Sequence, residues 1–406
     1  MPEKRKVCAV ICELNPLHAG HQALFAHAKK GGRALVCVLS GNFVQRGEPA
    51  LLDKWARTKL ALHSGADLVL ELPLPWAMAG AERFAAGGVA LAAALGNVDT
   101  LLFGSEEPDL QPLERLAEAL LSPAFSQALQ GEDPALPFAQ RRQQAAARLV
   151  GEDAAALLAK PNCILGVEYL KAIRAQGAAL QAETFPRLGA GHDRPEAEGP
   201  LLSASQAREL LAQGGDAEGR LPAVTQKAWR EEAAAGRAPA LLSRLELPIL
   251  CKLRTMSPQD FAALPDVSEG LEHRLYQAAR QAGSLAELLG GIKSKRYPTA
   301  RARRLVLSAF LGLGSGPLPP LPPYLRVLGM TPTGQEILKE ATPALPLAAR
   351  PGDFQKLGGQ ALTLFQLEAQ ADDLYALSSP TPQPCGRDYT QGLIKIGFYG
   401  EREDQP

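Results

Sequence analysis

The chain has 406 residues and carries 43 basic and 43 acidic side chains, so its formal net charge at pH 7 is zero. This length suits two or three domains. A content of 46% hydrophobic and 21% charged residues excludes an intrinsically disordered protein. A neutral chain also excludes a nucleic-acid surface that covers the whole molecule, so any such surface must be a local basic patch.

The sequence shows neither a secretory leader nor an apolar run long enough to cross a membrane, which predicts a soluble, cytoplasmic protein. Six cysteines occur without a CxxC pair or zinc-like spacing. We expect them to be small core residues in a reducing compartment, and we predict no metal site built from the protein.

The first half of the chain alternates between short apolar runs and segments of helical character. The predicted strands are 7–12, 34–40, 68–72, 100–104 and 180–185. The predicted helices are 21–30, 54–64, 81–95 and 163–176. Continuous apolar strands separated by helices are typical of a parallel sheet covered on both faces. The fold class is therefore α/β, a doubly wound parallel sheet, with ligands expected at the carboxyl ends of the strands.

A histidine motif follows the first predicted strand. His18-Ala19-Gly20-His21 lies where the strand turns into a helix, and a helix N-terminus offers unpaired N–H groups to an anion. Two histidines at this spacing can donate to the oxygens of one phosphate as charge develops during displacement at the α-phosphate. The alternatives are a two-histidine metal site and histidines with a structural role.

A second motif opens a helix after the fifth strand. Ser203 and Ser205 can cap this helix and donate to a phosphate, and Arg208 lies one turn later with a forked guanidinium. An ordinary helix cap with a solvated arginine is the alternative. Together the two motifs predict that His18, His21, Ser205 and Arg208 are catalytic.

The rest of the chain divides into two further segments. Residues 205–316 show helical periodicity without a convincing strand, and a proline-rich connector follows. From residue 324 onward we expect a mixture of short helices and loops. The predicted domains are 1–204 (nucleotide-binding α/β domain), 205–316 (helical region) and 317–406 (connector and C-terminal region).

The motifs resemble one family in the HxGH nucleotidyltransferase superfamily, the tRNA(Met) cytidine acetate ligases, over roughly residues 7–340. The resemblance lies in six blocks that occur in the family's order: 13–21, 40–50, 54–59, 103–106, 161–166 and 293–297. Leu14 and Leu17 replace aromatic residues of the family pattern, Ala19 replaces asparagine, and Ser205 stands where threonine is common. None of these departures removes a reactive group.

The resemblance implies a ligase that forms a carbon–nitrogen bond. ATP and acetate would give acetyl-adenylate and pyrophosphate, and the wobble cytidine of elongator tRNA(Met) would then take the acetyl group to give N4-acetylcytidine, releasing AMP. Mg²⁺ is expected to bind through the phosphates of ATP. The ATP-binding residues implied by the family are Val10, Ile11, Cys12, Glu13, Leu14, Asn15, Pro16, Leu17, His18, Ala19, Gly20, His21, Gln22, Ala23, Gly104, Asn162, Arg187 and Leu188.

The tRNA-binding surface is expected in a stretch that carries basic residues without an acidic one. We predict that it comprises Lys293, Lys295, Arg296, Arg301, Arg303 and Arg304, with a smaller cluster at Lys54, Arg57 and Lys59. An exposed basic helix face without a partner is the alternative. Two other functions stay open, a small-molecule adenylyltransferase and a non-catalytic RNA-binding factor on the same fold.

Overall fold

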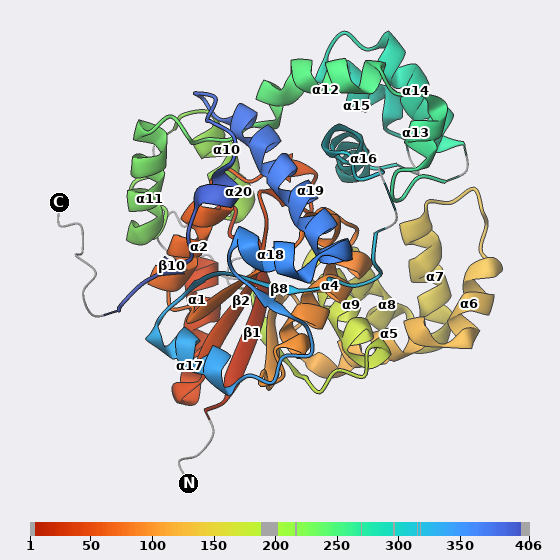
Figure 1. The fold of residues 1–406 in the computed structure, drawn as a ribbon. Coiled ribbons are helices and arrows are strands. Elements are labelled where there is room, and N and C mark those ends of the chain that lie inside the picture. The colour runs from red at the N-terminus through yellow and green to blue at the C-terminus, as the bar shows by residue number, and fades with distance from the viewer. Residues whose placement is uncertain are drawn as a thin grey trace.

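A computed structural model describes residues 5–187, 202–215, 217–268, 270–294, 297–314, 316 and 318–398. Its centre is a sheet (Figure 1). The strand order is β10-β8-β5-β2-β1-β6-β7, and the short β9 pairs with β8. The strands are β1 (Val7–Cys12), β2 (Ala34–Ser40), β5 (Leu68–Leu72), β6 (Thr100–Ser105), β7 (Gln181–Pro186), β8 (Leu325–Met330), β9 (Leu347–Ala348) and β10 (Ile394–Lys395). The first five of these are parallel, which confirms the predicted fold class.

Alternate residues of the central strands point to opposite faces of the sheet. Val7 and Ala9 of β1 join one hydrophobic core, while Cys8 and Val10 join a second core on the other side. Because both faces are covered, the strands are apolar along their whole length. Helices α1 (Ala19–Ala28) and α2 (Lys54–His63) contribute to the second core.

The first core is covered by a larger group of helices. They are α3 (Leu74–Ala77), α4 (Ala81–Ala94), α5 (Leu110–Leu121), α6 (Pro123–Gln130), α7 (Phe138–Val150), α8 (Glu152–Ala156) and α9 (Pro161–Ala175). Helices α4 and α9 pack on one another beside the strands. In the described part of the chain, no helix is long and apolar enough to span a bilayer.

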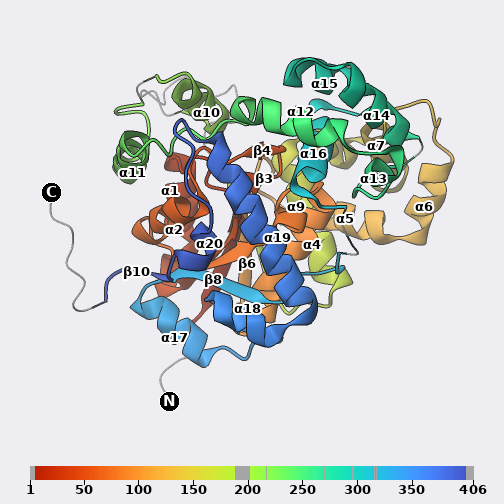
Figure 2. The same cartoon turned by 45° about the horizontal axis from the view of Figure 1, so that its top comes forward.

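The predicted helical segment is confirmed for its described residues, in which no strand occurs. It contains α10 (Ala204–Ala212), α11 (Ala223–Ala234), α12 (Glu246–Arg254), α13 (Pro258–Ala262), α14 (Leu271–Gln281), α15 (Leu285–Ile292) and α16 (Thr299–Leu311). Helices α12 to α16 share a third hydrophobic core and lie together at one end of the molecule (Figure 2). The hairpin of β3 (Phe43–Val44) and β4 (Glu48–Pro49) reaches this core, because Phe43 is buried in it.

The prediction of short helices and loops after residue 324 is wrong in part. Strand β8 pairs antiparallel with β5 and extends the sheet, and β10 pairs with β8. The helices α17 (Pro332–Glu340), α18 (Pro351–Leu357), α19 (Gly359–Tyr375) and α20 (Arg387–Thr390) accompany these strands, and α19 has 17 residues. The sheet is thus built from both ends of the chain, and the helical region is inserted between β7 and β8.

Candidate nucleotide-binding site

The predicted motifs meet at one edge of the sheet. Strand β1 lies between β2 and β6, and β6 lies between β1 and β7. The chain order therefore reverses at β1, which is the position where open α/β sheets bind ligands beyond the carboxyl ends of their strands. The turn with the two histidines follows β1, Gly104 lies at the end of β6, and Arg187 comes directly after β7.

The turn between β1 and α1 is held by hydrogen bonds from three other segments. Leu14 has a φ of 50°, a conformation that non-glycine residues adopt only at a cost of roughly 1–2 kcal/mol. The carbonyl oxygen of Glu13 accepts from Arg57 Nη1 at 2.8 Å, and that of Asn15 accepts from Arg208 Nη1 at 2.9 Å. The backbone N–H of Leu51 donates to Asn15 Oδ1 at 2.9 Å. These bonds fix the turn in a shape that Leu14 would not adopt alone.

Both histidines of the motif use Nδ1 as a hydrogen-bond acceptor. His18 caps α1, and its Nδ1 accepts from the backbone N–H of Gly20 at 3.0 Å. His21 Nδ1 accepts from the backbone N–H of His18 at 3.3 Å. In a neutral imidazole, the nitrogen that does not accept carries the proton. The backbone thus sets the tautomer that leaves Nε2–H on both rings as a donor.

The glycine of the motif has a packing role in this arrangement. A Cβ atom at Gly20 would lie 2.8 Å from His18 Cε1 and 3.0 Å from its Nδ1. The capping histidine folds back over position 20, and the space between the two is too small for a side chain. The closest neighbour of position 20 is thus the histidine of the motif itself.

The environment keeps both imidazoles uncharged. Burial, together with the positive charges of Arg187 and Arg208, lowers the pKa of His18 to about 4. Burial lowers the pKa of His21 well below 6.5, with further contributions from His18 and Arg187. The ring centroids of the two histidines are 4.0 Å apart. At neutral pH the site therefore offers neutral N–H donors flanked by permanent guanidinium charges.

The second motif is joined to the first through Arg208. Ser203 caps α10, with its side chain accepting from the backbone N–H of Gln206. Arg208 donates from Nη2 to Ser205 Oγ at 3.0 Å while Nη1 binds the carbonyl oxygen of Asn15. The alternative of a solvated arginine does not fit, because the Arg208 side chain is only 15% exposed.

A third group of site residues surrounds the start of α9. Arg187 donates from Nη1 to Asn162 Oδ1 at 2.7 Å, and Asn162 Nδ2 donates to Glu106 Oε1 at 2.5 Å. The Glu106 carboxylate also accepts from the backbone N–H groups of Asn162 and Cys163. A Cβ atom at Gly104 would make only an ordinary 3.5 Å contact with Arg187 Cγ, so packing within the chain does not by itself require glycine there.

One site carboxylate, Glu106, was not assigned a role from the sequence, and a second, Glu13, was assigned one only through the family resemblance. Glu106 belongs to a block that carried the resemblance, yet its hydrogen bonds to the start of α9 depend on a residue 56 positions away. Burial raises the pKa of Glu13, although its Oε1 accepts from the backbone N–H of Gln45 at 2.8 Å and arginines lie nearby. Both lie just beyond the end of a strand, which is the signal that the sequence pattern offers apart from the resemblance.

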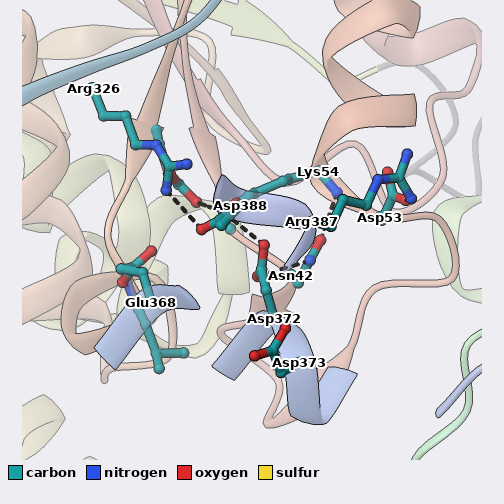
Figure 3. A network of polar contacts seen from close by, with 12 residues as sticks. Asn42, Asp53, Lys54, Arg326, Glu368, Asp372, Asp373, Arg387 and Asp388 are labelled. Carbon is teal, nitrogen blue, oxygen red and sulfur yellow. Dashed lines mark hydrogen bonds and ion pairs between the residues drawn. The ribbon is translucent and has the colours of Figure 1, made fainter. Parts of the chain in front are cut away.

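The prediction that Lys54 and Arg57 belong to a tRNA-binding cluster is wrong. Both side chains are fully buried. Lys54 Nζ forms ion pairs of 2.8–2.9 Å with Glu71, Asp372 and Asp388. Figure 3 shows Lys54 beside the two aspartates. Arg57 donates to backbone carbonyl oxygens at the carboxyl ends of β1 and β2. Of that cluster only Lys59 is exposed.

The network around Lys54 fastens the C-terminal part of the chain to the N-terminal part. Arg326 of β8 pairs with Glu71 of β5 and with Asp388 of α20 at 2.8 and 2.9 Å. Burial would lower the pKa of Lys54, but the surrounding carboxylates raise it, so the ammonium stays charged. Burial and neighbouring carboxylates raise the pKa of Glu368 and of Asp372 well above their ordinary values.

The other predicted tRNA-binding residues that the structure describes lie in or near α16. Lys293 is exposed, and Arg301, Arg303 and Arg304 are partly exposed. Arg301 donates to Asp266 O, and Arg304 donates to Gln45 O. Lys295 and Arg296, like Leu188 of the predicted ATP site, lie outside the described residues. Among the residues that the structure describes, no group of three or more His, Cys, Asp and Glu side chains could hold a metal ion.

A parallel sheet with an HxGH turn at its switch point, and an arginine helix bound to that turn, defines a nucleotidyltransferase of the HxGH type. The family model of the HIGH nucleotidyl transferases matches residues 5–390. The chain belongs to this family and, within it, to the tRNA(Met) cytidine acetate ligases.

The relatives cover almost the whole chain. A protein of Acetivibrio thermocellus named tRNA(Met) cytidine acetate ligase is 34% identical, covering 96% of this chain and 99% of its own length. One of the same name from Syntrophomonas wolfei is 36% identical with the same coverage. The apo crystal structure of Thermotoga maritima TmcAL superposes with a TM-score of 0.88 at 31% identity, covering 96% of this chain and 99% of that one. A second form, bound with alpha-thio ATP, gives 0.85 at 30% identity and covers 96% and 100%.

Proposed function

We propose that this chain is an ATP-dependent acetate ligase that forms N4-acetylcytidine at the wobble position of elongator tRNA(Met). The observation that carries the proposal is the convergence of His18, His21 and Arg208 on one turn at the switch point of the sheet. Relatives that share about a third of their residues over nearly the full length carry the name of this activity.

In the first step, a carboxylate oxygen of acetate attacks the α-phosphorus of ATP. A new P–O bond forms, the bond to the bridging oxygen breaks, and pyrophosphate leaves with its electron pair. In this proposal the Nε2–H groups of His18 and His21 donate to the phosphate oxygens, where one such donor is worth roughly 3–4 kcal/mol in the transition state. Arg208 and Arg187 supply fixed positive charge beside them.

In the second step, the exocyclic amine of the cytidine attacks the acetyl carbonyl of acetyl-adenylate. A C–N bond forms, AMP leaves, and the amine loses one proton to solvent or to a base. We propose that the tRNA is held by Lys293, Lys295, Arg296, Arg301, Arg303 and Arg304. These residues occupy one segment of a chain whose formal net charge is zero, as local phosphate recognition requires.

Mg²⁺ is proposed as the companion of ATP. The described residues contain no cluster of acidic, histidine and cysteine side chains that could hold a metal. Mg²⁺ is usually bound through one or two protein ligands together with substrate phosphates, so it can enter the site together with ATP. When bound, the ion would neutralise charge on the pyrophosphate leaving group.

The test combines the purified protein with tRNA and two alternative acetyl sources. With ATP, Mg²⁺ and labelled acetate we expect labelled N4-acetylcytidine, detected by mass spectrometry, together with one AMP and one pyrophosphate per acetyl group. With acetyl-CoA and no ATP or acetate we expect no product. Product from acetyl-CoA alone would contradict the ligase mechanism. A small-molecule adenylyltransferase would instead release pyrophosphate without modifying tRNA, and a non-catalytic factor would release none.

A further inference from the structure

The hairpin of β3 and β4 lies between the proposed ATP site and α16. On one side, the backbone N–H of Gln45 donates to Glu13 Oε1 at 2.8 Å, next to the turn that carries the histidines. On the other side, Arg304 Nη1 of α16 donates to the carbonyl oxygen of the same Gln45 at 3.1 Å. One residue of the hairpin is thus bonded to both the ATP-site turn and the proposed tRNA-binding helix.

Close packing fixes the hairpin against α16. A Cβ atom at Gly47 would lie 2.6 Å from the backbone nitrogen of Arg304 and 2.7 Å from Arg303 Cβ. Gly47 also has a φ of 71°, which favours glycine. At the base of the hairpin, Phe43 is buried in the core of the helical region and makes an edge-on contact with Tyr375. The hairpin therefore cannot move away from α16 without breaking packed contacts.

Glu48 joins the two sides through its carboxylate. Glu48 Oε1 lies 3.4 Å from Arg208 Nε, and Glu48 Oε2 lies 3.4 Å from Arg303 Nη1. The side chain of Glu48 is 21% exposed, that of Arg208 15% and that of Arg303 37%. Partly buried ion pairs are less screened than surface pairs, so a carboxylate between two guanidinium groups restricts both.

The contacts of Arg208 leave little freedom for its guanidinium. Nη1 binds the carbonyl oxygen of Asn15, Nη2 binds Ser205 Oγ, and Nε faces Glu48. Burial and the positive charge of Arg46, on the same hairpin, lower the pKa of Arg208, while the carboxylates of Glu48 and Glu13 raise it. Without the Glu48 carboxylate, Arg208 would lose one of its three anchors and would face the charge of Arg46 with less compensation.

We propose that Glu48 is a positioning residue of the ATP site, and that Arg303 anchors it from the tRNA-binding helix. This inference rests on the proposed function. Glu48 aligns the Arg208 guanidinium toward the triphosphate, and Arg303 holds the second oxygen of Glu48. Acetate activation thus depends on α16 even before tRNA binds. If Arg303 only bound tRNA phosphates, acetate activation in the absence of tRNA would not depend on it.

The experiment measures acetate-dependent exchange between ATP and pyrophosphate in the absence of tRNA. It compares the full-length protein with Glu48→Gln, Arg303→Ala, the double variant, and the control Arg254→Ala. Arg254 also lies in the helical region, but it donates to the carbonyl oxygen of Ala282, away from the hairpin. For Glu48→Gln we expect the KM for ATP to rise about five- to tenfold with a smaller change in kcat, the size of effect that a partly buried ion pair gives.

For Arg303→Ala we expect a KM rise in the same direction, and for Arg254→Ala none. Residues that act through one contact are not additive, so the double variant should be no worse than Glu48→Gln within about twofold. Arg303→Lys should recover part of the loss, because it restores the charge. If either Glu48→Gln or Arg303→Ala leaves the KM for ATP unchanged, or if their effects multiply in the double variant, the proposal is overturned.

Two further measurements distinguish a failure of this proposal from loss of folding and from a failure of the proposed function. Melting temperatures within a few degrees of the parent show that a changed KM does not come from unfolding. If the parent protein shows no acetate-dependent exchange, the proposed function fails. Calorimetric titration of the same variants with ATP then still decides the positioning role, since weaker ATP binding in both single variants supports it and unchanged binding contradicts it.

Discussion

Arg208 donates from Nη1 to the carbonyl oxygen of Asn15 at 2.9 Å, although 193 positions separate the two residues. The same guanidinium binds Ser205 Oγ in its own helix. The two sequence motifs are thus parts of one site, because the arginine of the second motif holds the turn that carries the first. A change at Arg208 acts on the shape of the HxGH turn as well as on any charge that it offers to phosphate.

Replacement of His21 by alanine should nearly abolish acetate activation. It removes one Nε2–H donor, and the loss of one donor to a developing negative charge lowers the rate about 10²- to 10³-fold. The measurement is pyrophosphate exchange with ATP and acetate. His273→Ala is the matched control, since that imidazole is 73% exposed in the helical region. A His21→Ala protein that exchanges at the parent rate would rule out the phosphate-site assignment.

His18 should make stability depend on pH in the acidic range. Its pKa is about 4 in the folded protein against an ordinary 6.5, so the unfolded chain binds more protons between these values. The free energy of unfolding therefore rises with pH between about 4 and 6.5, and this increase is complete above pH 6.5. Urea titrations at several pH values should show this slope, and His18→Gln should flatten it. An unchanged slope in the variant would contradict a buried, neutral His18.

Neutralising Lys293, Lys295 and Arg296 together should weaken tRNA binding with little effect on acetyl-adenylate synthesis. Three fewer phosphate contacts flatten the dependence of log K on log salt by roughly three units at most. Filter binding at several salt concentrations measures the slope, and pyrophosphate release without tRNA measures activation. Equal loss of both activities would show that this stretch supports folding or ATP binding and not tRNA binding alone.

Replacement of Lys54 by methionine should destabilise the protein by about 3–5 kcal/mol, because it leaves buried carboxylates without their shared cation. Lys59→Met is the matched control on the same helix, where the side chain is exposed and a change within roughly 0.5 kcal/mol is expected. Denaturation in urea measures both. If the Lys54→Met protein is as stable as the parent, the carboxylates around position 54 become protonated in the variant without a loss in the free energy of unfolding, which contradicts the prediction.

The five parallel strands and the two motifs could be predicted because their signals are local. An apolar run such as 34–40 marks a strand by itself, and the residues that follow it must lie at the carboxyl edge of the sheet. The HxGH turn and the S-x-S-x-x-R helix are read in the same way, from a few adjacent residues. The hydrogen bonds that set the histidine tautomers are equally local, although only the structure shows them.

Strand β8 and the burial of Lys54 could not be predicted, since both depend on partners far away in sequence. Leu325–Met330 is a short run after a proline-rich segment, and its partner strand β5 ends at Leu72. Lys54 and Asp388 are 334 positions apart. A lysine one helical turn before an arginine resembles an exposed basic patch when the distant carboxylates are not known. Arg57 binds backbone carbonyl oxygens, for which side-chain identity gives no signal.

The pairing of β8 with β5 has a consequence for synthesis of the chain on the ribosome. More than 250 residues separate the end of β5 from the start of β8. At roughly 5–20 residues per second, the N-terminal strands wait on the order of tens of seconds for the strand that covers their edge. During that time β5, buried along its whole length in the finished protein, exposes unpaired backbone groups to other nascent chains. Binding by a chaperone during translation is therefore most valuable before residue 330 emerges.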